Sequence, residues 1–218
     1  MIKVLLVDDH ELVRTSIKLL LGDVENIVVT GEAKSGEDAI RLARELDPDV
    51  ILMDLNMPGM GGFEAVMRVL RNKPTPKILI LSAYTSGLVP ARLLNLGVTG
   101  YLSKHAKRED MIHAIQTVYS GNRYIDPLIA DSIASFHTTS KNNLSSVVQL
   151  TDRELQMLIL IANGMDRNDI AKSLYLSKKK INGYISSAIK KLGTNTDAEA
   201  IRIAIQSGLV KIASQTTQ

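Results

Sequence analysis

Five mostly apolar runs in the first half of the chain lack regular alternation with polar residues. Such runs are typical of strands buried on both faces of a parallel sheet. Between them, apolar residues recur every three or four positions, as in helices. The pattern predicts an α/β fold, with a doubly wound five-stranded parallel sheet and helices on both faces. The predicted strands are Lys3–Val7, Ile27–Ala33, Val50–Met53, Ile78–Leu81 and Val98–Leu102.

The second half of the chain has helical spacing only. Thr151 and Glu154 form the pattern of a capping box, which starts a helix. A short helix follows, and Leu176-Ser177 then predicts a tight junction and an N-cap before a longer helix over 178–192. A short helix, a small turn and a longer helix are typical of a helix-turn-helix domain. A last helix is predicted over 197–207.

A polar stretch separates these two halves. Residues 138–146, TTSKNNLSS, have almost no apolar content and predict a solvated linker. Before them, residues 125–136 have apolar positions at helical spacing, with Pro127 in the first turn of a predicted helical extension. We therefore expect an α/β domain at 1–120, an extension with a linker at 121–146, and a smaller all-α domain at 147–218.

Acidic residues follow two of the predicted strands. Asp8 and Asp9 come directly after the first strand, and Asp54 follows the third. The carboxyl ends of parallel strands meet at one edge of the sheet, so these carboxylates should converge. Close carboxylates repel one another and favour a bound cation, and Mg²⁺ prefers oxygen ligands. One Asp after a strand is more often only a turn or capping residue. Three at one edge indicate a Mg²⁺ site and phosphate chemistry.

Two further residues at the same edge fit this chemistry. Ser82 closes ILILS and Lys104 follows GYLS, so a hydroxyl and an ammonium group can bind phosphoryl oxygens. Asp54 precedes the turn-rich loop LNMPGMGG, which leaves its carboxylate open. We expect Asp54 to be the nucleophile that forms an aspartyl phosphate.

Positive charge belongs to the helical half. Up to residue 121 the chain has 14 Lys and Arg against 15 Asp and Glu, and from residue 122 it has 12 against 8. Several of these lysines are on the longer helix, where DNA phosphates would meet them. A lysine run alone is more often a solvated helix face, but its place in a helix-turn-helix favours DNA. The lysines are Lys178, Lys179, Lys180, Lys190 and Lys191.

Other classes of protein are disfavoured. The chain has no Cys, which excludes disulfides and thiolate metal sites. Its N-terminal residues run directly into a core strand rather than a signal peptide, and no apolar run approaches the roughly 18 residues of a membrane helix. The four histidines lack metal-site spacing. These features predict a cytoplasmic protein without membrane insertion.

The motifs VLLVDDHELVR, DVILMDLNMPGMGG, ILILSA and GYLSK resemble the receiver domain of two-component response regulators. That resemblance implies that Asp54 is the phosphoacceptor and that Lys104 contacts the phosphoryl group. It also implies a Mg²⁺ site formed by Asp8, Asp9, Asp54 and the main-chain carbonyl of Asn56, and a switch pair of Ser82 and Tyr101. His105 stands where many receivers have Pro, so the cis peptide bond common there is not expected.

The stretch LTDRELQMLILIANGMDRNDIAKSLYLSKKKINGYISSAIKKLG resembles the LuxR-type helix-turn-helix. A receiver with a LuxR-type domain is the NarL/FixJ class, and this chain is most similar to the GacA/UvrY/LetA group of global regulators. The resemblance implies several partners: a membrane hybrid sensor histidine kinase, promoter DNA of small regulatory RNA genes, RNA polymerase, and a second copy of the chain when phosphorylated. It implies DNA contacts by Lys178, Lys179, Lys180, Asn182, Gly183, Ser186 and Lys190, with Asn182, Gly183 and Ser186 as the base readers.

Two alternatives remain open. The first is an aspartyl-phosphate phosphatase or phosphotransferase with a helical cap. Two features count against it: no acidic residue stands two positions after Asp54, and the helical segment is not inserted as a cap. The second is a receiver that acts through protein contacts only, since Gly183 and the Ser186-Ser187 pair depart from the usual reading helix. We expect a phosphorylation switch on DNA binding, in a protein that catalyses only its own phosphoryl transfer and dephosphorylation.

Overall fold

The computed structural model describes residues 1–55, 57, 60–71, 76–82, 88–139, 147, 149–207 and 209–210, with the backbone alone at 135–139. The chain divides into two compact units, Met1–Ile133 and Ala134–Gln218.

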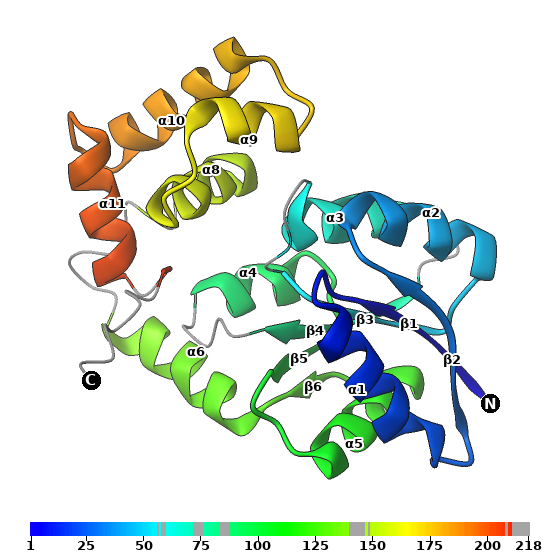
Figure 1. Cartoon of the computed structure of the whole chain (residues 1–218). Helices are drawn as coiled ribbons and strands as arrows, with labels where there is room; N and C mark the ends of the chain where they lie inside the picture. Colours follow the sequence, from blue (N-terminus) through cyan, green and yellow to red (C-terminus); the bar gives the residue numbers. More distant parts are fainter. Residues whose placement is uncertain are drawn as a thin grey trace, which may run out of the picture. The chain divides into compact units, whose positions relative to one another are not determined.

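The first unit is built on one parallel sheet with strand order β2-β1-β3-β4-β5-β6 (Figure 1). Reversal of the strand order between β1 and β3 creates a crevice at their carboxyl ends, where α/β proteins bind ligands. The strands are β1 (Ile2–Val7), β2 (Ile27–Ala33), β3 (Val50–Met53), β4 (Lys77–Ser82), β5 (Gly100–Ser103) and β6 (Tyr124–Ile125).

Helices cover both faces of this sheet (Figure 1). On one face, α1 (Glu11–Gly22) and α5 (Arg108–Tyr119) bury apolar residues against the strands in a single core cluster. On the other face lie α2 (Gly36–Leu46), α3 (Gly61–Val69) and α4 (Leu88–Asn95). The central strands β1 and β3 are buried almost throughout, as their unbroken apolar runs predict.

The second unit is helical. After its linker region, its described residues form α8 (Asp152–Ala162), α9 (Arg167–Ser173), α10 (Lys178–Lys191) and α11 (Asp197–Gln206). Thr151 and Glu154 form the predicted capping box at α8, and Ser177 is the predicted N-cap of α10. The short α9, the turn and the longer α10 give the predicted helix-turn-helix outline.

The predicted α/β fold is confirmed, with one added strand. The two-residue β6 pairs with β5, and α6 (Pro127–Thr139) follows it. Two residues are too few to show a period, so the sequence indicated only an extension here. The predicted linker began at Thr138, but α6 continues through Thr139, and residues 140–146 lie outside the described part of the chain. Among the described residues, no helix is long and apolar enough to cross a membrane.

Candidate functional site

The predicted acidic residues converge at the carboxyl ends of β1 and β3. The amide of Asp54 donates to the carbonyl of Val7 over 2.8 Å, which fixes the end of β3 against the end of β1. The amide of Lys104 donates to the carbonyl of Ser82 over 3.1 Å, which does the same for β5 and β4. The sheet therefore brings residues from four strand ends to one edge.

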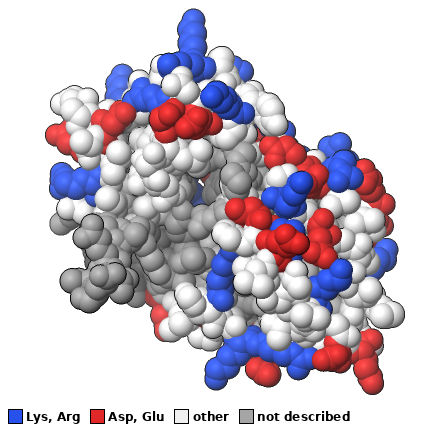
Figure 2. All heavy atoms as spheres, viewed as in Figure 1, with Lys and Arg blue, Asp and Glu red and all other residues white. Residues whose placement is uncertain are grey.

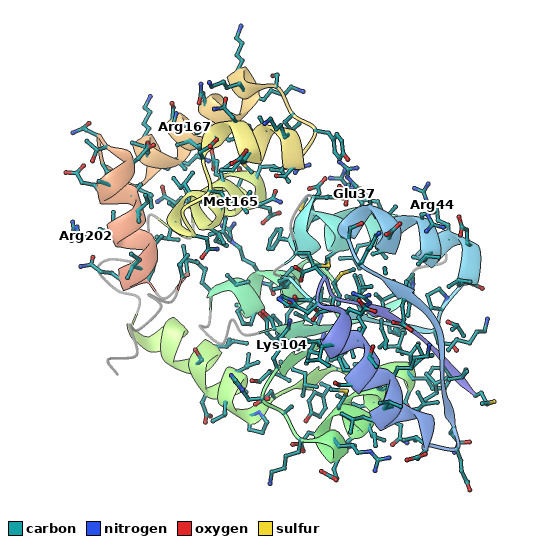
Figure 3. The ribbon with its side chains drawn as sticks, in the orientation of Figure 1. Glu37, Arg44, Lys104, Met165, Arg167 and Arg202 are labelled. Carbon is teal, nitrogen blue, oxygen red and sulfur yellow. The ribbon has the colours of Figure 1, made fainter. Side chains whose placement is uncertain are left out.

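Lys104 joins two of the carboxylates. Its Nζ lies 2.7 Å from Asp8 Oδ2 and 2.8 Å from Asp54 Oδ2. The two carboxylate oxygens are thus at most 5.5 Å apart, the sum of those distances. Burial by itself lowers the pKa of Lys104, but the hydrogen bonds to Asp54 and Asp8 outweigh burial and raise it. Lys104, which is labelled in Figure 3, is therefore a fixed positive charge beside these two carboxylates.

His10 lies beside the acidic pair. Its Nδ1 is 3.2 Å from Asp8 Oδ1 and 3.0 Å from Asp9 Oδ1, while its amide donates to Asp8 Oδ1 over 2.9 Å. Arg14 donates from Nη1 to the main-chain carbonyl of Asp8 over 2.8 Å. These bonds hold the Asp8-Asp9 turn in place at the start of α1.

The donor set fits Mg²⁺. Ligand atoms of Asp8, Asp9 and His10 lie within 4.8 Å of one another, and Asp54 joins them through Lys104. Mg²⁺ takes carboxylate oxygen and water in preference to imidazole nitrogen, so the three carboxylates are the suitable ligands. The fourth predicted ligand, the carbonyl of Asn56, lies outside the described residues.

The predicted switch residues are on two further strands of the same sheet. The side chains of Ser82 and Tyr101 are both fully buried, on the neighbouring parallel strands β4 and β5.

Close packing also supports Asp54, because α3 approaches the backbone beside it. A Cβ at Gly62 would lie 2.0 Å from the Asp54 carbonyl oxygen, so only glycine fits there.

The longer helix of the second unit separates its faces as expected. Ile181, Ile185 and Ala188 are buried in the helical core. The opposite side presents Lys179, Asn182, Gly183, Ser186 and Lys190, of which Asn182 is half-buried and the rest are exposed. The other two predicted DNA contacts, Lys178 and Lys180, are exposed in the first turn of the helix. Basic and acidic side chains are interleaved on the face of this unit seen in Figure 2.

Sequence reasoning missed two polar clusters in this unit. Glu154 is buried and accepts from Ser187 Oγ over 2.6 Å and from Lys191 Nζ over 2.7 Å, which ties α8 to α10. Arg167 bonds both Asn182 and Asp197. The capping-box pattern predicted Glu154 as a capping residue. The partners of Glu154 and of Arg167 have no local sequence signal, because they are far away in the chain.

The two halves of the chain match two known families. Residues 4–116 match the response regulator receiver domain, and residues 148–204 match the bacterial regulatory proteins of the luxR family. The chain belongs to the response regulators with a LuxR-type DNA-binding domain. This family assignment makes the protein a DNA-binding transcription regulator, as the sequence motifs implied.

Relatives of this response regulator match it over its full length. The response regulator GacA of Pseudomonas aeruginosa is 42% identical over 98% of this chain and 100% of its own length. The response regulator UvrY of Escherichia coli K12 is 41% identical over 100% of both chains. A solved structure of the RcsB response regulator of Salmonella typhimurium is similar with a TM-score of 0.74 and 25% identity, over 94% of this chain and 98% of that one. The predicted similarity to the GacA and UvrY group is confirmed.

Proposed function

We propose that this response regulator is phosphorylated on Asp54 by a sensor histidine kinase and that phosphorylation controls its binding to promoter DNA. The observation that carries the proposal is the pair of contacts from Lys104, whose Nζ lies within 2.8 Å of both Asp8 and Asp54. A fixed ammonium group beside a buried carboxylate is what an incoming phosphoryl group requires, because it offsets the added negative charge.

In the proposed reaction, an Asp54 carboxylate oxygen attacks the phosphorus of the kinase's phosphohistidine. The P–N bond breaks as the P–O bond forms, and the imidazole leaves with its electron pair and takes a proton. Asp8, Asp9 and Asp54, with the Asn56 carbonyl, would hold Mg²⁺, which when bound supplies positive charge to the phosphoryl oxygens. The protein catalyses this transfer and its own dephosphorylation, and no metabolic reaction.

The switch follows from the charge that Asp54 gains. A phosphoryl group adds negative charge and three acceptor oxygens, which Lys104 and the hydroxyl of Ser82 can bind. Movement of Ser82 opens space beside the buried Tyr101, whose side chain can then shift with it. This biases a two-state equilibrium in the first unit and favours a homodimer that binds DNA.

The start of α10 supports DNA as the partner. Three lysines occupy its first turn, where no acidic residue lies. Positive charge at a helix N-terminus opposes the helix dipole and costs about 0.3 to 1 kcal/mol for each charge. The same charges and the amides of Lys178 and Lys179 in that turn attract a phosphate, so a DNA backbone contact explains the lysines. The resemblance of the sequence motifs to the GacA/UvrY group suggests a finer proposal. Small regulatory RNA genes are the targets, a membrane hybrid kinase is the phosphoryl donor, and RNA polymerase is a further partner. The protein acts in the cytoplasm.

Phosphorylation of the full chain with a small phosphodonor and Mg²⁺ tests the proposal. Wild-type protein should take up one phosphoryl group per chain by intact mass, and Asp54→Asn should take up none. Asp49→Asn is the matched control, because Asp49 lies just before the same strand at its opposite end. Labelling of Asp54→Asn equal to wild type would show that the phosphoacceptor lies elsewhere. Sustained turnover of a phosphate ester would favour the enzyme alternative.

A further inference from the structure

Arg167 connects three helices of the second unit. It is the first residue of α9 and directly follows the N-cap Asp166. Its Nη1 donates to Asn182 Oδ1 of α10 over 2.9 Å. Its Nη2 lies 2.7 Å and 2.5 Å from the two carboxylate oxygens of Asp197, the first residue of α11. One guanidinium thus bonds a predicted base reader and a carboxylate at the same time (Figure 3 labels Arg167).

The chemistry of arginine fixes which way the Asn182 amide faces. A guanidinium has five N–H donors and no acceptor, so only the oxygen of Asn182 can face Arg167. The Nδ2 group and its two donors must therefore point elsewhere, and just one lone pair of Oδ1 remains. Without Arg167, the amide can rotate by half a turn and exchange its donor and acceptor positions.

Asp197 holds Arg167 in this position and offsets its charge. The side chains of Arg167 and Asp197 are 33% and 44% exposed, so solvent screens the pair and it contributes little to stability. The helices have their own buried contacts, including Ile170 of α9, Ile181 of α10 and Ala200 of α11. The ion pair is thus not needed to hold the helices together, which points to a role in orienting Asn182.

We propose that Arg167, anchored by Asp197, is a positioning residue that sets the orientation of the Asn182 amide for reading bases. The inference rests on the proposed function of α10 as the DNA-reading helix. Base edges in the major groove differ in their order of donors and acceptors, so an amide of fixed orientation discriminates between bases better than one that rotates freely. Arg167 then affects discrimination between DNA sequences without contacting a base.

The test uses the full chain and a randomised duplex library, from which the wild-type protein selects a preferred site. Binding isotherms on the selected duplex and on a random duplex give a discrimination ratio. Asn182→Ala should lower that ratio, and Arg167→Met, which keeps the length and removes the donors, should lower it about 3- to 10-fold. Affinity of Arg167→Met for the random duplex should change less than about twofold. In the Asn182→Ala background, Arg167→Met should have no further effect on the ratio.

Two variants guard against a change in folding. Asp197→Asn keeps Arg167 but weakens its anchor, and it should lower the ratio in part. Arg167→Lys keeps the charge without the planar fork, so it should bind random DNA as wild type does but should not restore full discrimination. In wild-type protein without DNA, the side-chain N–H bonds of Asn182 should have high NMR order parameters, which report restricted rotation of the amide about χ2, and these should fall in Arg167→Met.

Several results would overturn the inference. Equal losses on random and selected duplexes in Arg167→Met, with a salt slope lower by about one, would make Arg167 a phosphate contact. Additive effects of Arg167→Met and Asn182→Ala would show that the residues act independently. If wild-type protein discriminates no sequence, the proposed function fails. If Asn182→Ala loses discrimination while Arg167→Met keeps it, only the positioning role fails.

Discussion

Glu154→Gln should destabilise the helical unit strongly at neutral pH. Glu154 is the buried acid of the capping box at α8 and also accepts from Ser187 and Lys191 of α10. Glutamine preserves the shape of the side chain and can still cap the helix. It removes the negative charge that faces Lys191 and replaces one acceptor oxygen with a donor. The loss of stability therefore measures the contribution of the charged interaction between α8 and α10.

The size of this loss follows from the pKa of Glu154. Burial raises that pKa, but hydrogen bonds from Lys191, Ser187 and Thr151 outweigh burial and lower it from 4.5 to about 2. A difference of about 2.5 between the unfolded and folded pKa values corresponds to about 3 kcal/mol of stability. Because the folded pKa is the lower one, this stability is fully present above the unfolded value and is lost as the pH falls toward about 2. Near pH 3, less than about half of it remains.

The measurement is urea unfolding of the full chain, followed through the methyl NMR signals of Ile181 and Ile185. Because these buried residues belong to α10, their signals report unfolding of the helical unit alone. The unfolding of the two units is then not treated as one transition. We expect Glu154→Gln to lower the free energy of unfolding by about 3 kcal/mol at pH 7 and by clearly less near pH 3.

The matched control is Glu199→Gln. Glu199 has the same place in the first turn of α11 and accepts from the amide of Asn195 over 3.1 Å. It is exposed, however, and among the described residues no lysine pairs with it. Its replacement should cost less than about 1 kcal/mol. A loss for Glu154→Gln as small as that of the control, or one that does not depend on pH, would refute the reasoning.

Three further predictions concern the two candidate sites. Asp9→Ala should lose Mg²⁺ binding and phosphorylation of Asp54 together, measured by calorimetry and intact mass; unchanged Mg²⁺ affinity would contradict the proposed ligand set. Gly183→Ala should raise the free energy of unfolding by about 1 kcal/mol, because no atom lies within 4 Å of the added Cβ and glycine is a poor helix former. Lys179→Ala should weaken binding to selected and random DNA alike and lower the salt slope by about one, whereas a loss confined to the selected duplex would assign it a base contact.

Local pattern in the sequence determined the elements and the types of residue at their ends. Unbroken apolar runs specified the buried strands, because a strand covered on both faces has no solvent side. Since parallel strands end at one edge, the convergence of Asp8, Asp54 and Lys104 also followed from the pattern. The capping box at Thr151 and the N-cap at Ser177 were predicted for the same reason, since a cap is formed by residues within one helical turn.

Only the tertiary structure decided which polar groups meet. Lys104 pairs with Asp8 across 96 residues, and the sequence predicted their neighbourhood but not that one ammonium group contacts two carboxylates. β6 was missed because it exists only through its pairing with β5. The contacts of Arg167 depend on how α9, α10 and α11 cross, and crossing angles depend on packed side chains from three distant segments. Periodicity states which side of a helix is buried, whereas the partners on its polar side are fixed by the geometry of the whole unit.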